Sequence, residues 1–499
     1  MTKRRDFIKK SILGTAGIAI GGLGFSARSY ASIIGANDEI RLAVVGLGNR
    51  GLGSHIPEFG NLPGVKITAV CDPDRERLSA GAQKISASFN YKPVEVVDVR
   101  QLMDRKDLDV ITVATMQYWH ALPTIWACQT GRDVYVEKPL AHFIWEGRQM
   151  LNAARKYDRI VQTGMQSRSF RPASDEMIKW VREGNLGKIL YAMCFACKPR
   201  QPIGKRTEPL PIPDTLDYNL WCGPASNGPI YRDKIQYDCS FTWDKGDGES
   251  VNQGVHQMDD ARWILGYTGM PRKVMSIGGR FLFNDAGDVP NMQINCLDYP
   301  EVPIFYVAYN LPRVKELVGK LDGDRKFYTN SRGYSGVGTY LQCEKGHIFF
   351  PDEDGEAILT AFDPDGKKIR EFTGGENHFA NFINAVRTHK RETLNAEILE
   401  GHRSTNLCHI ANISLRLGAS APVAEQRKQV AECGSTGFQE IHEHFVKHLE
   451  SLGIDPGTAT LGPWLECDVE RECIRDNPKA NEIVKGFYRK GFEVPEIAW

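Results

Sequence analysis

Short apolar runs alternate with stretches of helical spacing from Ile40 to about residue 165. The apolar runs that read as buried strands are Ile40–Val45, Lys66–Cys71, Val94–Val97, Asp109–Thr115 and Val134–Val136. Strands that alternate with helices form parallel sheets with right-handed crossovers. This part of the chain therefore predicts a doubly wound parallel sheet, whose ligands bind at the carboxyl ends of its strands.

The pattern changes after Gly187. Strand-like segments then follow one another, separated by Gly and Pro turns, and two helix-like segments come last, Asn377–Arg387 and Ile398–Leu417. The strand-like segments are Ile189–Met193, Lys273–Ile277, Met292–Cys296, Ile304–Tyr309, Gly338–Cys343 and His347–Phe350. This change of pattern predicts a second domain, rich in strands, after the first.

The first apolar run ends in a glycine-rich turn, Gly46-Leu47-Gly48-Asn49-Arg50-Gly51, which has the form G-x-G-x-x-G. In such a turn the first glycine permits the tight bend, the second lets a pyrophosphate approach, and the third brings the next helix close to the sheet. The free N–H groups at the helix start favour the negative charge. We predict a dinucleotide site built on these six residues.

The next strand ends in Asp72, about twenty residues beyond the glycines, where a carboxylate accepts from a ribose hydroxyl. Asp72 would repel a 2′-phosphate, so NAD is favoured over NADP. Arg75 and Arg77 lie close enough in sequence to leave NADP open.

The N-terminal residues have the pattern of a targeting signal rather than of a folded element. Lys3-Arg4-Arg5-Asp6-Phe7 is followed by a Gly-rich, mildly apolar run and by the small-residue site Ser29-Tyr30-Ala31. Residues 1–31 resemble a twin-arginine signal, with an ordinary Sec signal or an uncleaved anchor as alternatives. We predict export by the twin-arginine machinery, to the periplasm or an equivalent compartment.

Net charge and metal-ligand spacing narrow the function further. The formal net charge is zero, which points neither to nucleic acid nor to an anionic membrane. No metal centre is expected, because His378, His402 and His409 are spread over two helix-like segments without a paired carboxylate pattern. The twelve cysteines do not suggest a disulfide framework, and most are expected to be buried as small apolar residues.

Three ordered motifs point to a known family. Ala114-Thr115-Met116-Gln117-Tyr118-Trp119-His120 is similar to A-T-P-x-x-x-H, with Met116 in place of the proline. Glu137-Lys138-Pro139 follows a strand, and Asn252-Gln253-Gly254-Val255-His256-Gln257-Met258-Asp259 is similar to D-x-G-x-H-x-x-D. With the glycine loop, these motifs resemble the Gfo/Idh/MocA oxidoreductases, the family of glucose-fructose oxidoreductase and inositol dehydrogenase, over about residues 40–418.

The resemblance implies an α/β protein, with an N-terminal Rossmann domain and a C-terminal α+β domain built on an open, mostly antiparallel sheet. We place the Rossmann domain at residues 38–165, the substrate domain at 166–418, with its late helices packing back on the first domain, and an extension at 419–499. For the extension we favour a packing arm or dimer contact over a lid. Because family members often pair through the open sheet face, a homo-oligomer is expected.

The resemblance also implies site residues. Lys138 would orient the substrate hydroxyl, and His256 would act as acid and base. Histidine suits this role because its ordinary pKa lies near the pH at which the enzyme operates. Thr115, Glu137 and Lys138 would join the glycine loop and Asp72 at the cofactor. His120 would line the cofactor or, equally, be a core histidine.

Substrate contacts are assigned more broadly. Gln166 and Arg168 follow the last strand of the first domain and could reach the cleft, and Trp243, with Trp119 and Trp221, offers a flat face for a sugar. Asn252 stands where inositol-dehydrogenase-like members carry an aspartate; an amide cannot take a proton, so Asn252 could instead bind a substrate hydroxyl. Asp259 could orient His256 or cap its helix.

Export limits the chemistry. A periplasm is not expected to hold a free NAD pool, so a cofactor carried out in the folded protein could not be exchanged for a fresh molecule. Each catalytic cycle must then restore the redox state of the bound cofactor. The prediction is an exported NAD-dependent oxidoreductase acting on a secondary hydroxyl of a sugar or polyol. The alternatives are a redox-neutral NAD-dependent glycoside hydrolase, as among the exported α-N-acetylgalactosaminidases of this family, and a sugar-binding protein without catalysis.

Overall fold

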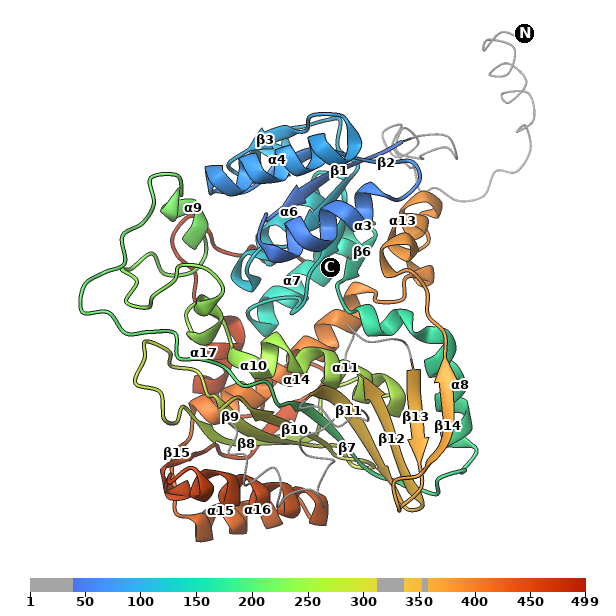
Figure 1. Cartoon of the computed structure of the whole chain (residues 1–499), viewed down its shortest axis with the longest axis vertical. Coiled ribbons are helices and arrows are strands. Elements are labelled where there is room, and N and C mark those ends of the chain that lie inside the picture. The colour runs from blue at the N-terminus through green and yellow to red at the C-terminus, as the bar shows by residue number, and fades with distance from the viewer. Residues whose placement is uncertain (1–38, 312–335, 352–357) are drawn as a thin grey trace. The chain divides into compact units, whose positions relative to one another are not determined.

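The computed structural model describes residues 39–311, 336–351 and 358–499, so the predicted export signal lies outside the described residues. The first sheet has six parallel strands in the order β3-β2-β1-β4-β5-β6, as predicted (Figure 1). The strands are β1 (Ile40–Val45), β2 (Val65–Cys71), β3 (Val94–Val96), β4 (Val110–Val113), β5 (Asp133–Val136) and β6 (Val161–Thr163). The order reverses between β1 and β4, which is where such sheets bind ligands.

Helices cover both faces of this sheet. They are η1 (Gly51–His55), which runs into α3 (Ile56–Gly60), α4 (Arg75–Phe89), α5 (Arg100–Met103), α6 (Ala121–Gln129) and α7 (Ile144–Lys156), with the short turn η2 (Gln117–Trp119) before α6. The side chain of Asp74 caps α4 by accepting from Glu76 N, and Asn90 ends it in the left-handed region. Local capping thus fixes where the chain re-enters the sheet.

The second sheet is open and mostly antiparallel, and the α/β fold class is confirmed. Its order is β14-β13-β12-β11-β7-β10-β9-β8-β16-β15, and only β7 and β10 run parallel among the described strands. The strands are β7 (Ile189–Ala196), β8 (Lys273–Gly279), β9 (Met292–Asp298), β10 (Ile304–Tyr309), β11 (Val337–Cys343), β12 (Gly346–Pro351), β13 (Ile358–Phe362), β14 (Lys368–Thr373), β15 (Ala419–Ser420) and β16 (Thr460–Leu461); β17 (Leu465–Asp468) pairs with β8 and β18 (Cys473–Ile474).

One face of the second sheet packs on helices that lie toward the first domain. They are α8 (Arg171–Arg182), α10 (Gly248–Asn252), α11 (Gly254–Leu265) and α14 (Ile398–Arg416). Helix α14 is buried on nearly all sides because it contacts α11 and β8 as well as α7 and β6 of the first domain. The helix α13 (His378–Thr388) packs on α3. Longer connections carry the short elements η3 (Gln166–Ser169), α9 (Tyr218–Cys222), η4 (Asp238–Phe241) and η6 (Arg391–Thr393).

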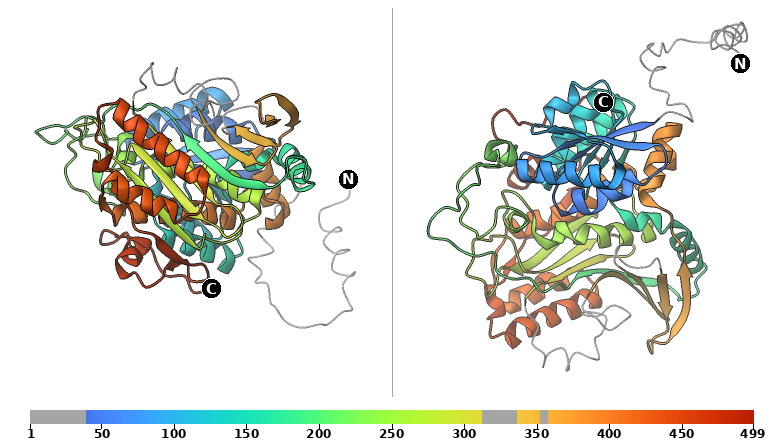
Figure 2. Two further views of the ribbon diagram at one scale, coloured as in Figure 1. Left: turned by 90° about the horizontal axis from the view of Figure 1, so that it is seen from below. Right: turned by 45° about the horizontal axis from the view of Figure 1, so that its top comes forward.

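The other face of the second sheet is covered by the C-terminal extension. Helices α15 (Val423–Ala431) and α16 (Thr436–Ser451) lie against the strands, as Figure 2 shows from below. Phe438, Phe445 and Leu449 of α16 are fully buried in a cluster with side chains of β7 to β12. The face through which a homo-oligomer was expected is therefore at least partly occupied by this chain itself, and the oligomer stays a prediction.

The last residues return to the first domain. After η7 (Pro456–Thr458), β16, β17 and β18 comes α17 (Pro478–Lys485), and the tail that follows buries Phe492, Val494 and Ile497 in the core of the Rossmann domain. The extension thus packs against both domains. Among the described residues, no helix combines the length and the apolar character needed to cross a membrane.

Candidate active site

A single cleft of about 790 Å³ lies at the carboxyl ends of the first sheet. Its walls come from the turns after β1, β2, β3, β4 and β5 on one side and from the second domain on the other. The lining residues that the sequence analysis had assigned are Gly46, Gly48, Asn49, Arg50, Asp72, Thr115, Glu137, Lys138 and Asn252. The five turns meet there because the carboxyl ends of parallel strands share one edge.

The glycine loop has the shape that a pyrophosphate requires. Gly46 has a φ of +88°, and a Cβ on it would lie 2.7 Å from the backbone of Ala114 and Thr115. A Cβ on Gly51 would lie 1.9 Å from Gly46 O, so the helix start could not approach. Gly48, in contrast, has only a side-chain atom of Arg77 at 3.6 Å, which leaves its surface open to a ligand. The cradle therefore fits a dinucleotide.

Asp72 supports this loop while facing the cleft. Its carboxylate accepts from Leu47 N at 2.7 Å and from Asp74 N at 2.9 Å. Burial raises the pKa of Asp72, and these two N–H groups oppose the rise. Arg77 also lines the cleft, where a cation could contact the 2′-phosphate of NADP. NADP therefore stays open as a cofactor, as the sequence analysis left it.

Glu137 ties the first helix to the end of β5. Its Oε1 accepts from Arg50 Nε at 2.8 Å and lies 3.0 Å from His55 Nε2. Burial by itself would raise the pKa of Glu137, but Arg50 and His55 hold it well below its ordinary value. Glu137 is therefore an ionised anchor of the cofactor wall.

Lys138 joins the two domains across the cleft. Its Nζ donates to the main-chain carbonyl of Asn252 at 2.5 Å, and the Lys138–Pro139 peptide is cis. The side chain of Lys138 is half-buried and lines the cleft. Two motifs more than a hundred residues apart are thus in direct contact at one point.

His120 stands behind this wall. It is 1% exposed, and its ring nitrogens lie 2.7 Å from Pro139 O and 3.1 Å from Thr115 O. It does not belong to the cleft lining. Of the two open alternatives, this placement is that of a core histidine, one that holds the turns after β4 and β5 together.

His256 lies near Lys138 but deeper than the lining residues Asn252 and Gln253. It is 1% exposed. Burial lowers the pKa of His256 well below its ordinary value; the charge of Lys138 adds to this, and Glu137 opposes it. The imidazole is thus neutral at neutral pH, and its acid/base role stays a prediction.

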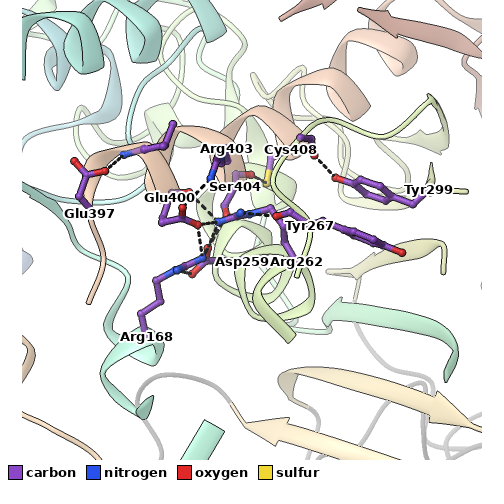
Figure 3. A network of polar contacts seen from close by, with 12 residues as sticks. Arg168, Asp259, Arg262, Tyr267, Tyr299, Glu397, Glu400, Arg403, Ser404 and Cys408 are labelled. Atoms are coloured by element: carbon purple, nitrogen blue, oxygen red, sulfur yellow. Dashed lines mark hydrogen bonds and ion pairs between the residues drawn. The ribbon is translucent and has the colours of Figure 1, made fainter. Parts of the chain in front are cut away.

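Arg168 and Asp259 belong to a network of polar contacts (Figure 3). Both residues are buried, and neither lines the cleft. Arg168 donates to both oxygens of Asp259, at 2.7 and 2.8 Å, and to Glu400 at 3.1 Å. Ser404 donates to Asp259 at 2.5 Å, and Arg262 contacts both carboxylates. Asp259 does not cap the helix of His256, whose N-cap is Gln253. The expected reach of Arg168 into the cleft was wrong, because these ion pairs hold its guanidinium.

Two further expected substrate contacts lie elsewhere. Gln166 donates to the Tyr135 hydroxyl at 3.1 Å and does not line the cleft. Trp243 lines a separate cavity of about 400 Å³, where the Arg416 guanidinium lies 5.1 Å from its ring centre. Trp119 and Trp221 do line the cleft.

The sequence analysis missed much of the substrate side. The lining residues it did not assign there include Lys198, Arg200, Gln236, Tyr237, Ser240 and Gln253. Lys198 donates to Gln253 Oε1 at 2.8 Å. Tyr237 has a φ of +64°, a strained conformation for a bulky residue. Gln253 lies inside the motif that begins at Asn252, at a position where the motif specifies no residue type, and the other five positions carry no motif. The only signal for Lys198 and Arg200 was that they follow a strand end.

The C-terminal tail supports one cleft wall from outside. Arg489 donates to Gly223 O at 2.8 Å and to Asn219 O at 2.6 Å, and Phe492 packs edge-on against Trp119. Trp119 Nε1 in turn donates to Leu220 O at 2.9 Å. No described residue of 419–499 lines the cleft, so in this arrangement the extension is a packing arm.

Comparisons with known proteins agree with this architecture. Residues 40–165 match the Gfo/Idh/MocA model described as oxidoreductase family, NAD-binding Rossmann fold. Residues 186–286 match the model described as oxidoreductase family, C-terminal alpha/beta domain. The first match thus identifies the N-terminal part of the fold as an NAD-binding Rossmann domain, and the second match covers the start of the following sheet.

Two relatives carry hydrolase names. A glycosyl hydrolase family 109 protein of Shewanella pealeana is 30% identical over 206 residues, 38% of this chain and 44% of the relative. An alpha-N-acetylgalactosaminidase of Shewanella oneidensis is 27% identical over 207 residues, with the same shares. The chain thus matches less than half the length of these relatives.

A solved structure shows the same fold. The WlbA dehydrogenase of Bordetella pertussis, in complex with NADH and UDP-GlcNAcA, is 17% identical, with a TM-score of 0.53, over 76% of this chain and 97% of that one.

Proposed function

We propose that this chain, which carries the two domains of the Gfo/Idh/MocA oxidoreductases, is an NAD-dependent enzyme acting on a secondary hydroxyl of a sugar or polyol. The observation that carries the proposal is the continuity of the cleft. The glycine loop and Asp72 occupy one end, and Lys138 and Asn252 face the same space. A cofactor on the loop and a hydroxyl beside Lys138 would share one cavity.

Three residues of the chain would bind the substrate and accept its proton. Bound NAD supplies the hydride acceptor. The ammonium of Lys138 donates to the substrate hydroxyl oxygen and fixes its position, and the Asn252 side chain binds a neighbouring hydroxyl. We assign proton acceptance to His256, which burial keeps neutral and which lies within the electrostatic reach of Lys138.

Trp119 and Trp221 form an apolar wall of the same cleft. Flat aromatic faces suit the C–H faces of a pyranose ring. The sugar or polyol class is supported by these two residues and by the sugar compounds in the names of related proteins.

We further propose that residues 1–31 direct export by the twin-arginine machinery to the periplasm. The cofactor would then be loaded before export and retained. Retention requires a reaction cycle that restores the redox state, which leaves coupled oxidation of one sugar and reduction of another, or redox-neutral cleavage of a glycoside.

The second candidate, redox-neutral glycoside hydrolysis, is favoured by the names of the relatives. In that reaction a transient oxidation makes a ring C–H acidic, the aglycone is eliminated, water adds, and the hydride returns to the sugar. Lys138 and His256 would serve both chemistries, so the cleft alone does not separate them.

The test starts from purified protein without added nucleotide. The protein is denatured and the supernatant assayed for NAD and NADP, and intact protein is then given a nitrophenyl α-N-acetylgalactosaminide. Stoichiometric NAD with release of nitrophenol supports the hydrolase, and stoichiometric NAD without release directs the search to coupled sugar redox. A protein that is purified without nucleotide and binds NAD reversibly contradicts retention of the cofactor. A protein that binds neither NAD nor NADP overturns the whole proposal.

A further inference from the structure

Two cysteines from distant parts of the chain meet beneath the C-terminal extension. Cys296 lies on β9 in the middle of the second sheet, between Met275 of β8 and Phe305 of β10. Cys433 lies in the turn between α15 and α16. Their Sγ atoms are 3.0 Å apart, about 1 Å more than the length of a disulfide bond.

The two thiols differ in the way that exchange chemistry requires. Cys296 is fully buried, and burial raises its pKa well above the ordinary value. Cys433 is partly exposed, and its hydrogen bond with Cys296 lowers its pKa. An exposed thiol of lowered pKa reacts first, and a buried partner in contact with it can close the bond.

No other pair of cysteines in the described part of the chain has its sulfurs in contact. Cys194 and Cys197 are close in sequence but belong to the apolar clusters on opposite faces of the sheet. Cys467 and Cys473 lie on paired strands but are not opposite each other, because Cys467 pairs with Ile474. Selectivity for one pair is therefore built into the fold.

The position gives the pair a structural purpose. The contacts of α16 with the sheet include an apolar cluster with Phe438 and Phe445 and a polar contact of 3.3 Å between Tyr309 and His444. A covalent bond at Cys433 would fix the start of this helical hairpin to the centre of the sheet.

We propose that Cys296 and Cys433 are a modification site that forms a disulfide and staples the α15–α16 hairpin to the second sheet. The oxidant is a low-molecular-weight or protein disulfide. The Cys433 thiolate attacks one of its sulfurs and releases the first thiolate. Cys296 loses its proton and attacks the Cys433 sulfur, and the second thiolate leaves. Two cysteine thiols are oxidised, the oxidant is reduced to two thiols, and these take up the two protons.

The test is thiol counting on the whole chain. Purified protein is incubated with excess oxidised glutathione, denatured, titrated and digested without reduction. The expected result is two thiols fewer than the twelve of the sequence and a peptide pair that joins Cys296 to Cys433. Twelve remaining thiols, glutathione left on Cys433, or a different linked pair would overturn the proposal.

Variants separate the bond from general thiol reactivity. Cys433→Ser should lose no thiols on the same treatment, whereas Cys467→Ser, a buried cysteine elsewhere in the extension, should still lose two. The oxidised wild type should unfold at a Tm about 5 °C above the reduced protein, and this shift should be absent from Cys433→Ser. An equal shift in both proteins would exclude the staple, whatever the thiol count.

Discussion

The Nζ of Lys138 donates to the main-chain carbonyl of Asn252 at 2.5 Å, and this bond joins the end of β5 to the end of α10. It places a cation from the Rossmann domain on a residue of the substrate domain, inside the cleft that the glycine loop also lines. The reacting hydroxyl of a substrate would therefore meet a positioned donor held by both domains.

Lys138→Met should reduce kcat by about 10³-fold, because the substrate hydroxyl loses its donor while the cofactor cradle is untouched. The NAD content of the purified variant, measured after denaturation, should equal that of the wild type. Lys198→Met, in the same cleft, is the matched control and should change KM more than kcat. A Lys138→Met enzyme within tenfold of wild type would remove Lys138 from the chemistry.

Asp72→Ala should weaken NAD binding by about 10- to 100-fold, since the ribose loses its hydrogen-bond acceptor and Leu47 N loses its partner. NADP binding should fall less, because the repulsion of its phosphate disappears too. Nucleotide fluorescence titrations measure both constants. The control is Asp98→Ala, which removes a carboxylate of the same cleft that is paired with Arg100. This variant should leave the ratio of NAD affinity to NADP affinity unaltered. A ratio that shifts equally in both variants would count against the contact of Asp72 with the ribose.

Asp259→Ala should lower the free energy of unfolding by about 3–5 kcal/mol, because it leaves the buried Arg168 without its main partner. Urea unfolding measures the loss. Arg171→Ala breaks an exposed pair with Asp175 and should cost at most about 1 kcal/mol. If Asp259→Ala were as mild as this control, the network would be dispensable to the fold.

The contribution of Asp247 to the stability of the protein should fall as pH rises from about 4 to about 8. Burial raises the pKa of Asp247 to about 8 from an ordinary 3.8, although Arg416 and Gln117 oppose the rise. In this window the folded state holds a proton that the unfolded state has lost, so unfolding becomes more favourable with increasing pH.

Asp247→Asn removes that dependence. Relative to wild type, its unfolding free energy should increase by roughly 2–5 kcal/mol between pH 4 and pH 8 and then level off. Chemical unfolding at a series of pH values checks the slope, with Asp244→Asn as a partly exposed neighbouring control. Parallel pH profiles for Asp247→Asn and the wild type would mean that this carboxyl is ionised in the folded protein.

Arg489→Ala should raise KM for the substrate several-fold with a smaller effect on kcat. The guanidinium holds Asn219 and Gly223 on either side of Leu220 and Trp221, which line the cleft. Steady-state kinetics separate the two constants. Arg427→Ala, on the surface of the same extension, should change neither; unchanged kinetics in Arg489→Ala as well would leave the tail without influence on the cleft wall.

The sequence by itself determined the two sheets and the cofactor end of the cleft. Strand and helix alternation is local, and so is the need for glycine at Gly46 and Gly51, where a side chain would strike the backbone. The motif at Lys138 also stands directly after its strand, and the topology of a parallel sheet brings such strand ends together.

Only the tertiary structure decided which side chains share the cleft. Gln166 and Arg168 follow a strand end as Thr115 and Lys138 do, yet ion pairs with Asp259 and Glu400 hold Arg168 outside. Trp243 lines a separate cavity and His120 is buried behind the cleft wall, whereas Lys198 and Tyr237 line the cleft from segments with no motif.

The physical reason is the range of the forces involved. Backbone geometry and periodicity act over a few residues and can be read along the chain. The partner of a polar side chain is decided by packing between elements that lie more than a hundred residues apart, as with Arg489 and Gly223 or with Cys296 and Cys433. Such contacts exist only once both domains and the extension have assembled.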